Sequence, residues 1–347
     1  MSLIAILGAL LLEQIFPLSS YTRLRLWLRN AIDYVERALA MDQVKPWQTF
    51  WFITLMGALI AGLLSFATHA IHPLLGLLLT IGVLYLTIGI RQFSHFYSKI
   101  RLALTAGDDA KARTALVEWL HEEAELTGYR GNIQVAQLSE TQLIRQALEM
   151  AIVSSLRYVF AGLFWFLIFA PFQLGVAGVV FYRLADLLAR RWHLRAEGKQ
   201  DAYTVYARKM MNWIEFLPAR CAAVIFAVVG NFEEAMYAWR TQSGSLRQLG
   251  ETDAAAVTLT SGAGALGVTL RDGVTQRTRD MMDEHELALY NEDAMSKTQE
   301  TTQSAGQIGN GPAPDVRTLN SGVGMFWRAM IFVLFLLLML TLSKILG

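Results

Sequence analysis

Long stretches without a charged residue constrain this chain more than any other feature. Residues 49–66 and 73–90 contain no Asp, Glu, Lys or Arg, and residues 325–346 carry only Arg328 and Lys344, close to their ends. Each stretch approaches the roughly 20 apolar residues that cross about 30 Å of hydrocarbon as a helix. Arg and Lys near the ends of such a helix can extend their side chains to the headgroups. The lipid bilayer is therefore the first predicted partner of this chain.

The overall composition agrees with a membrane protein and excludes one class of partner. Charged residues make up 17% of the chain and hydrophobic residues 54%, whereas soluble domains carry about 25% charged residues. The formal net charge is +1, so nothing in the charge favours binding to nucleic acid. The single cysteine, Cys221, excludes an internal disulfide and a cysteine metal cluster. Because Cys221 lies in an apolar stretch, we expect a small buried side chain there.

Three other apolar segments are short or interrupted. Residues 158–182 are broken by Pro171, and residues 216–230 are too short to cross a bilayer alone. Residues 3–12 are followed by Glu13 and lack the basic start and cleavage site of a signal peptide, so we expect a retained anchor. The broken segments predict re-entrant or interfacial helices.

The distribution of Lys and Arg predicts the orientation in the membrane. The loops 17–48, 91–157 and 183–215 hold five, eight and seven basic residues, whereas the link 67–72 holds none. Basic loops remain in the cytoplasm. We therefore expect these loops and residues 232–322 on the cytoplasmic side, with the 67–72 link and the C-terminus outside. The predicted fold is all-α: a polytopic helical membrane protein with cytoplasmic helical loops and re-entrant or broken helices.

The polar segments predict additional elements. Residues 22–40 match an amphipathic interfacial helix and residues 108–126 a further helix. Ser139 and Gln142 form a capping-box pattern for a helix that starts near residue 140.

A tether is expected near the C-terminus. Residues 296–322 are rich in Gln, Thr, Ser, Gly and Pro and predict a flexible linker. The expected organisation is thus a membrane domain over 1–295, a linker over 296–322 and a transmembrane helix over 323–347.

One glycine motif has two interpretations. Residues 262–267 read GAGALG, which matches the dinucleotide-binding pattern G-x-G-x-x-G. That pattern needs a preceding strand, and residues 252–260 are Ala-rich instead. We therefore favour close packing of small residues against another helix.

Acidic and histidine clusters are weak metal candidates. Glu118 and Glu122 share one helical face and could supply oxygen ligands to Mg²⁺, although a solvated face is the favoured interpretation. Other residues of this kind are His121 and Glu125 beside them, Asp280, Asp283, Glu284, His285 and Glu286 near the linker, and His69 and His72 in the 67–72 link.

Two arginines adjoin the broken apolar segments. Arg183 and Arg220 stand where ionisable groups are costly and usually have a partner or a function. They could bind an anionic ligand at the cytoplasmic rim, or they could pair with Asp186 or Glu215. The residues alone leave both alternatives open.

Several short phrases occur in the order found in a known family. They are GDDAKA (107–112), the stretch from Glu149 to Trp165 that runs into LFWF, YRLADLL (182–188), WIEFLPAR (213–220), FAVVGNF (226–232) and GALGVTL (264–270). Over residues 1–270 the chain thereby resembles the CobD/CbiB family of membrane-bound adenosylcobinamide-phosphate synthases. It also resembles their relative AmpE, an inner-membrane protein linked to β-lactamase induction. The resemblance implies a multi-pass protein of the bacterial cytoplasmic membrane.

The chain departs from the synthase pattern at polar positions. The synthases use ATP to join cobyric acid, through a carboxylate, to aminopropanol phosphate, which calls for Mg²⁺ ligands and polar orienting groups. Glu149, Phe164 and Trp165 match their pattern, but Val153 replaces a glutamate and Arg157 replaces an aspartate. The other departures are Ser154, the run Asp186 to Ala189, Met211, Asn212 and Glu215.

Two functional hypotheses follow from the resemblance. The first is a non-catalytic, AmpE-like accessory protein with no cofactor assigned, which binds an anion or a nucleotide at the cytoplasmic rim and acts through a protein partner or a second copy. Its candidate ligand-binding residues are Arg183, Arg220, Asp186 and Glu215. The alternative is a divergent ATP-dependent ligase of cobalamin biosynthesis that uses Mg-ATP. In that alternative Glu149 is the catalytic candidate, with Glu118 or Glu122 as substitute metal ligands. We favour the first hypothesis on the sequence alone.

Overall fold

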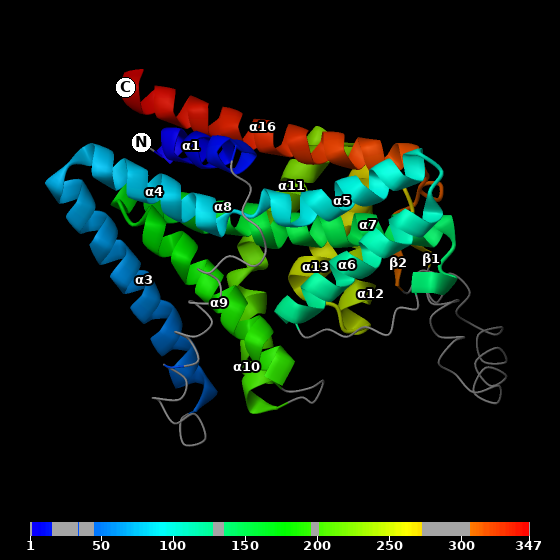
Figure 1. Cartoon of the computed structure of the whole chain (residues 1–347), viewed down its shortest axis with the longest axis horizontal. Helices are drawn as coiled ribbons and strands as arrows, with labels where there is room; N and C mark the ends of the chain where they lie inside the picture. Colours follow the sequence, from blue (N-terminus) through cyan, green and yellow to red (C-terminus); the bar gives the residue numbers. More distant parts are fainter. Residues whose placement is uncertain are drawn as a thin grey trace.

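The described part of the chain is almost entirely helical, as expected. The computed structural model describes residues 2–15, 34, 45–127, 135–195, 201–272 and 306–346 (Figure 1). Three sequence expectations fall largely outside these residues: the amphipathic helix at 22–40, the acidic cluster at 280–286 and residues 296–305 of the linker.

From α3 to β1 the elements follow one another closely, whereas residues 16–45 separate α1 from α3 and residues 273–306 separate β1 from β2. The helices are α1 (Ser2–Ile15), α3 (Pro46–Ile71), α4 (Pro73–Thr87), α5 (Ile90–Thr105), α6 (Asp109–Thr127), α7 (Glu140–Ser155), α8 (Ala161–Phe169), α9 (Gly175–Arg195), α10 (Ala202–Ile214), α11 (Phe216–Val229), α12 (Phe232–Gln248), α13 (Asp253–Leu266) and α16 (Val316–Leu346). A π turn (Leu156–Phe160) joins α7 to α8, and 3₁₀ turns lie at Val135–Gln137 and Ala170–Phe172. Strands β1 (Arg271–Asp272) and β2 (Gln307–Ile308) form one antiparallel pair.

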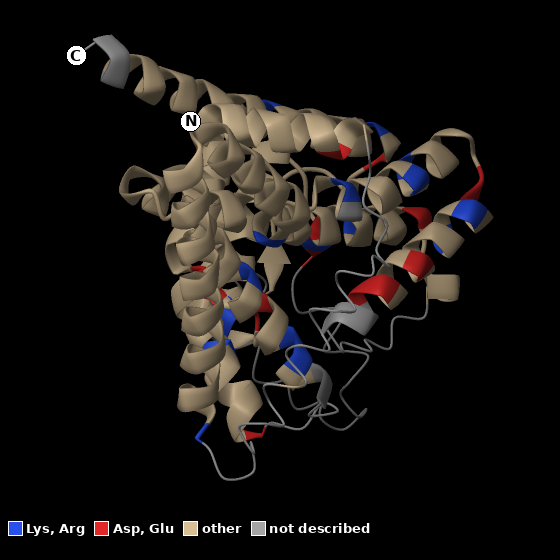
Figure 2. Cartoon of the chain, turned by 60° about the vertical axis from the view of Figure 1, so that its left-hand side comes forward, with Lys and Arg blue, Asp and Glu red and all other residues tan. Residues whose placement is uncertain are grey.

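Three described helices are long and apolar enough to cross a membrane: Pro46–Ile71, Glu140–Phe172 and Val316–Ser343. A fourth span is possible by the same criteria if α10 and α11, bent by 48° at their junction, count as one. Helices α3 and α4 contain no Asp, Glu, Lys or Arg, and α16 has none between Arg328 and Lys344, whereas Figure 2 shows charged residues gathered elsewhere on the molecule. The outer face of α3 exposes large apolar side chains such as Phe52, Leu59 and Leu63. These helices confirm a membrane-embedded protein.

The predicted hairpin at 49–66 and 73–90 is present, but its second arm is shorter than expected. Helix α4 ends at Thr87 and has only 15 residues, about 22 Å at 1.5 Å per residue. The chain leaves the helix at Gly89, whose N–H donates to the carbonyl of Tyr158 at 3.2 Å. Helix α5 then starts, and the Glu13 carboxylate accepts from the N–H of Arg91 at 2.8 Å. Glu13, which interrupts the apolar N-terminal run, therefore caps α5.

The broken segment 158–182 is divided between two antiparallel helices. The predicted capping box is confirmed: the Ser139 hydroxyl accepts from the Gln142 N–H at 3.2 Å, and the Gln142 side chain accepts from the Ser139 N–H at 2.8 Å. The helix that starts there continues to Phe172, and the chain reverses at Pro171 into α9. A Cβ at Gly178 would lie 2.4 Å from the Trp165 carbonyl oxygen, so this glycine allows α9 to pack closely on α8.

The GAGALG motif is a packing motif, as favoured from the sequence. It ends α13, whose residues 254–265 are all buried, so α13 is the central helix of the core. A Cβ at Gly264 would lie 2.4 Å from the Glu234 carbonyl oxygen, because α12 crosses α13 at this point. The residues before the motif are helical rather than a strand. The dinucleotide interpretation therefore lacks its structural context.

The C-terminal segment packs on the core earlier than the sequence suggests. Residues 306–315, expected as linker, contain β2 and a turn held by Gln242, whose side chain accepts from the Gly309 N–H at 2.8 Å and donates to Asn310 at 2.6 Å. Gly309 has φ of +83°, and a Cβ there would meet the Val268 carbonyl oxygen. Helix α16 already begins at Val316. It passes over α5, α7 and α11 and reaches α1, which brings the two ends of the chain together (Figure 1).

The prediction of a buried cysteine was wrong. Cys221 is exposed on the outer face of α11, together with Leu217, Val224 and Val228. An apolar face that is exposed in a membrane protein can lie against lipid, so apolar neighbours in the sequence did not imply burial in the protein core.

Candidate functional site

A cavity of about 870 Å³ lies among α7, the π turn, α9, α10 and α13. Each helix contributes residues spaced by three or four positions, which places them on one face. The lining residues from these elements are Gln146, Glu149, Met150, Val153, Ser154 and Arg157; Asp186, Ala189, Arg190 and His193; Thr204, Val205, Arg208, Lys209, Met211, Asn212 and Glu215; and Thr252, Ala255 and Leu259. Leu120 and Glu123 of α6, Gly250, Glu251 and Arg271 complete the wall.

The cavity brings together most of the positions at which the chain departs from the synthase pattern, and Glu149, which matches it. Glu149, Val153 and Arg157 come from one helical stretch, Asp186 from α9, and Glu215 from the end of α10. These residues are far apart in the sequence. Their convergence gives the family phrases a common physical location.

Glu149 is held by an arginine that sequence reasoning missed. Arg271 of β1 donates to both carboxylate oxygens of Glu149, at 2.9, 3.0 and 2.5 Å, and to Glu251 at 3.0 Å. Burial disfavours the charged form of Arg271, but the carboxylates of Glu149 and Glu251 outweigh it and raise the pKa of the guanidinium. Pairing of β1 with β2 fixes the backbone from which Arg271 reaches Glu149.

A second arginine organises the α9 side of the cavity. Arg190 donates to Asp186 at 2.8 Å and to the Tyr158 hydroxyl at 3.0 Å, and it lies 3.7 Å from Glu123. The hydroxyl of Tyr158 in turn donates to Glu123 at 3.1 Å. Arg190 was not predicted as a site residue. Its position four residues after Asp186, on the same helical face, was the available signal.

The predicted ligand-binding arginines have protein partners. Arg183 donates to the Tyr158 carbonyl at 2.8 Å and lies 3.7 Å from Asp186. Arg220 donates to Asp253 at 2.7 Å, and its guanidinium lies over the ring of Phe216. Neither arginine lines the cavity. The predicted pairing with Asp186 is therefore present for Arg183, whereas Arg220 pairs with Asp253 rather than with Glu215.

The carboxylates that line the cavity do not fit a protein-held magnesium ion. Mg²⁺ requires oxygen ligands in nearly octahedral arrangement. Glu149 and Glu251 accept from Arg271, Asp186 accepts from Arg190, and Glu215 accepts from the Tyr182 hydroxyl at 3.0 Å. Among the described residues, no three His, Cys, Asp or Glu side chains are placed to share an ion.

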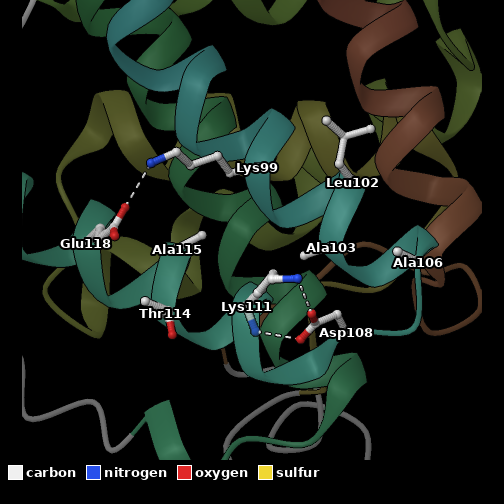
Figure 3. Close-up of a pocket in the computed structure, with 9 residues that line it drawn as sticks. All are labelled: Lys99, Leu102, Ala103, Ala106, Asp108, Lys111, Thr114, Ala115 and Glu118. Atoms are coloured by element: carbon white, nitrogen blue, oxygen red, sulfur yellow. Dashed lines mark hydrogen bonds and ion pairs between the residues drawn. The ribbon is translucent and has the colours of Figure 1, made fainter.

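A smaller hollow of about 470 Å³ between α5 and α6 contains Glu118, one of the predicted metal candidates. In Figure 3 its charged side chains face one another: Lys99 binds Glu118 at 3.0 Å, and Lys111 binds Asp108 at 2.8 Å. Glu118 is half exposed, and Glu122 is not part of this lining. These paired surface charges favour the solvated-face interpretation over a metal site.

The two histidines of the predicted 67–72 link have roles in the helices of the hairpin. His69 lies in the last turn of α3, where a ring nitrogen is 2.9 Å from the Ser65 carbonyl oxygen of the same helix. The His72 ring accepts from the Leu74 N–H at 3.2 Å and caps the start of α4.

Comparisons with known proteins agree with this geometry. Residues 6–305 match the family model described as CobD/Cbib protein. The chain is 26% identical over 336 residues to "Cobalamin biosynthesis protein CobD" of Stutzerimonas stutzeri, with 93% of each chain covered. It is 30% identical over 248 residues to the protein of the same name from Chromobacterium violaceum, with 70% of this chain and 72% of the relative covered. No solved structure matches. With the family model covering most of its length, the chain belongs to the CobD/Cbib protein family.

Proposed function

We propose that this protein acts in cobalamin biosynthesis as a membrane-bound ligase, joining a carboxylate of cobyric acid to the amine of aminopropanol phosphate at the expense of ATP. The observation that carries the proposal is the convergence of Glu149, Asp186 and Glu215 in one charged cavity. Both relatives described above are named as cobalamin biosynthesis proteins. This reverses the preference drawn from the sequence alone, which favoured a non-catalytic accessory protein.

The polar groups missing at Val153 and Met211 are offset by charged groups from other elements, which the sequence pattern did not reveal. Arg190, Glu251 and Arg271 line the same space. The cavity therefore keeps a dense set of charged groups despite the departures from the synthase pattern.

The proposed chemistry needs two things from these groups. ATP first converts the carboxylate into a phosphorylated form with a better leaving group, and the amine then forms the amide bond as phosphate leaves. The amine is protonated near neutral pH and must lose a proton before it attacks. A carboxylate in the cavity can accept that proton, and Glu149 is the first candidate because it matches the family pattern. The basic side chains can hold the phosphate groups of the substrates.

We further propose that the cavity is open to the cytoplasm and that the membrane is the bacterial inner membrane. The loop 183–215, which supplies Asp186 and Arg190, is rich in Lys and Arg, as cytoplasmic loops are. ATP is present on that side.

One observation keeps the accessory role as a second candidate. Val153, Arg157 and Met211 line the cavity where the synthases have acidic residues. An AmpE-like protein that binds an anion without turnover, alone or with a partner, would tolerate these residues.

The deciding experiment is a coupling assay. The purified protein is incubated in detergent with cobyric acid, aminopropanol phosphate and Mg-ATP, and the amide product is measured by mass spectrometry beside an active family synthase. We expect product above the blank. We also expect Glu149→Gln to lower turnover by at least a hundredfold, which is the usual contribution of a proton acceptor. An inactive protein beside an active control would favour the accessory role.

A further inference from the structure

The charged side chains of the cavity favour an anionic group that basic side chains bind directly, without a metal ion between them. Arg190 and Arg271 already engage Asp186, Glu149 and Glu251. The cavity therefore presents few free carboxylate oxygens to a cation, and its remaining basic groups decide what it attracts.

Three basic side chains on the wall have no ion-pair partner within 4 Å among the described residues: Arg157, Arg208 and Lys209. Arg208 donates to the Gly250 carbonyl and lies, like Lys209, on an exposed part of α10. Arg157 is half-buried, lines the cavity from the opposite helix and makes no hydrogen bond within the described residues. A guanidinium in such a place has its donors available for a ligand.

The backbone conformation around Arg157 is also of a kind that is common at functional sites. Arg157 belongs to the π turn between α7 and α8, and π turns inside helices frequently occur at functional sites. The turn is fixed from outside the cavity, because the Tyr158 carbonyl accepts from the N–H of Gly89 and from Arg183. Arg183 thereby secures the backbone that carries Arg157.

We propose that Arg157, together with Arg208 and Lys209, binds the phosphate group of a phosphate monoester directly, and that no divalent cation is required for this contact. Arg157 stands where the synthases resembled by this chain have an aspartate. A guanidinium can bind phosphate oxygens directly, which a carboxylate at the same position cannot do. For the proposed ligase, the monoester would be aminopropanol phosphate, and this assignment of the ester rests on the proposed function. The binding site itself does not require turnover.

The test is a binding measurement without ATP. The affinity of the purified protein in nanodiscs for aminopropanol phosphate and for inorganic phosphate is measured by calorimetry, once with EDTA and once with millimolar Mg²⁺. We expect the same affinity in both buffers. We expect Arg157→Gln to weaken binding roughly tenfold or more, the value of a charge-assisted hydrogen bond, and Arg157→Lys to recover part of the loss. Arg240→Gln is the matched control, because Arg240 is exposed on α12 and does not line the cavity.

The possible results distinguish direct phosphate binding from Mg²⁺-dependent binding and from no binding. Binding that requires Mg²⁺, absence of binding to the wild-type protein, or equal affinity in wild type and a folded Arg157→Gln variant would overturn it. Nanodiscs of phosphatidylcholine with and without phosphatidic acid are compared, because phosphatidic acid carries a phosphate monoester in its headgroup. Competition by phosphatidic acid would assign the site to a headgroup, and its absence would assign it to the soluble ester, with Arg157 required in both cases. A protein that binds the ester but forms no amide would support this site and reject the ligase.

Discussion

At the scale of single residues, the most consequential side chain is Arg271. It holds Glu149, whose side chain is 10% exposed, and Glu251, whose side chain is 30% exposed. Its partners lie 122 and 20 positions away in the sequence. No spacing or motif could have connected residues that distant. Glu149 itself was predicted from the family phrase, but the group that orients it became visible only in the fold.

Replacement of Arg271 should affect stability and turnover together. In Arg271→Ala, Glu149 loses the donor that compensates its burial, which should cost about 1–3 kcal/mol. Thermal unfolding in detergent measures this loss, and the coupling assay measures whether turnover falls further than stability does, as a positioning role requires.

The matched control is Arg145→Ala. Arg145 pairs with Asp272, the neighbour of Arg271. The Arg145 side chain is 15% exposed but Asp272 is 53% exposed, so the carboxylate stays hydrated when Arg145 is removed, and the loss should be about 1 kcal/mol or less. An Arg271→Ala variant that behaves like Arg145→Ala would contradict the structural importance of the Arg271 contacts.

At the scale of elements, close contact between α12 and α13 depends on a glycine. A Cβ at Gly264 would lie 2.4 Å from the Glu234 carbonyl and 2.6 Å from the Ala235 Cα, and both are backbone atoms that cannot turn aside. Gly264→Ala should therefore destabilise the protein by about 1–3 kcal/mol through overpacking. The lowering of the midpoint in a thermal unfolding scan reports this effect.

Gly244, also in α12, provides the comparison. No atom lies within 4 Å of a Cβ at this position. Gly244→Ala should therefore stabilise the helix by roughly 0.5–1 kcal/mol, because alanine loses less backbone entropy. Equal shifts in the two alanine variants would show that the tight crossing is not what makes Gly264 necessary.

The helices also show which structural features local sequence patterns predict and which they do not. The capping box at Ser139 and the uncharged stretch at 49–66 are local signals, and both gave the correct helices. The end of α4 at Thr87 was not predicted, since the apolar residues continue and the break is fixed by Gly89 binding to Tyr158. The π turn has no comparable local signal. Contacts between residues that are distant in the sequence determine such features.

At the scale of the whole molecule, the orientation in the membrane is still a prediction. It can be tested in a Cys221→Ala background with single cysteines at His72 and Lys111, both of which are exposed. We expect His72→Cys to react with a membrane-impermeant maleimide in intact spheroplasts. Lys111→Cys should react only after lysis, because its loop is rich in Lys and Arg. The reverse pattern would place the proposed cytoplasmic cavity on the wrong side.

The expected division into a membrane domain, a linker and a C-terminal helix stays a prediction, but the contacts of residues 306–315 are described. The composition of residues 296–322 predicted a flexible linker, but residues 306–315 pack against α12 and α13. Gly309 and Gly311 fit against the carbonyls of Val268 and Gly267, where a side chain would collide. Glycine therefore indicated close backbone packing here, although a glycine-rich composition also suggests flexibility. The boundaries of the proposed membrane domain remain a prediction.

The late position of β2 and α16 in the chain has a consequence for biosynthesis. Arg271 emerges from the ribosome before β2 exists, so β1 has no strand to pair with while the intervening residues are being translated. Helix α1 is made first, yet α16, which lies against it, is the last described element to be synthesised. A nascent chain can therefore insert its apolar hairpin into the membrane early. The wall of the cavity that carries Arg271 is completed only after translation has passed residue 308. Premature termination before that residue should therefore damage the site as much as a substitution within it.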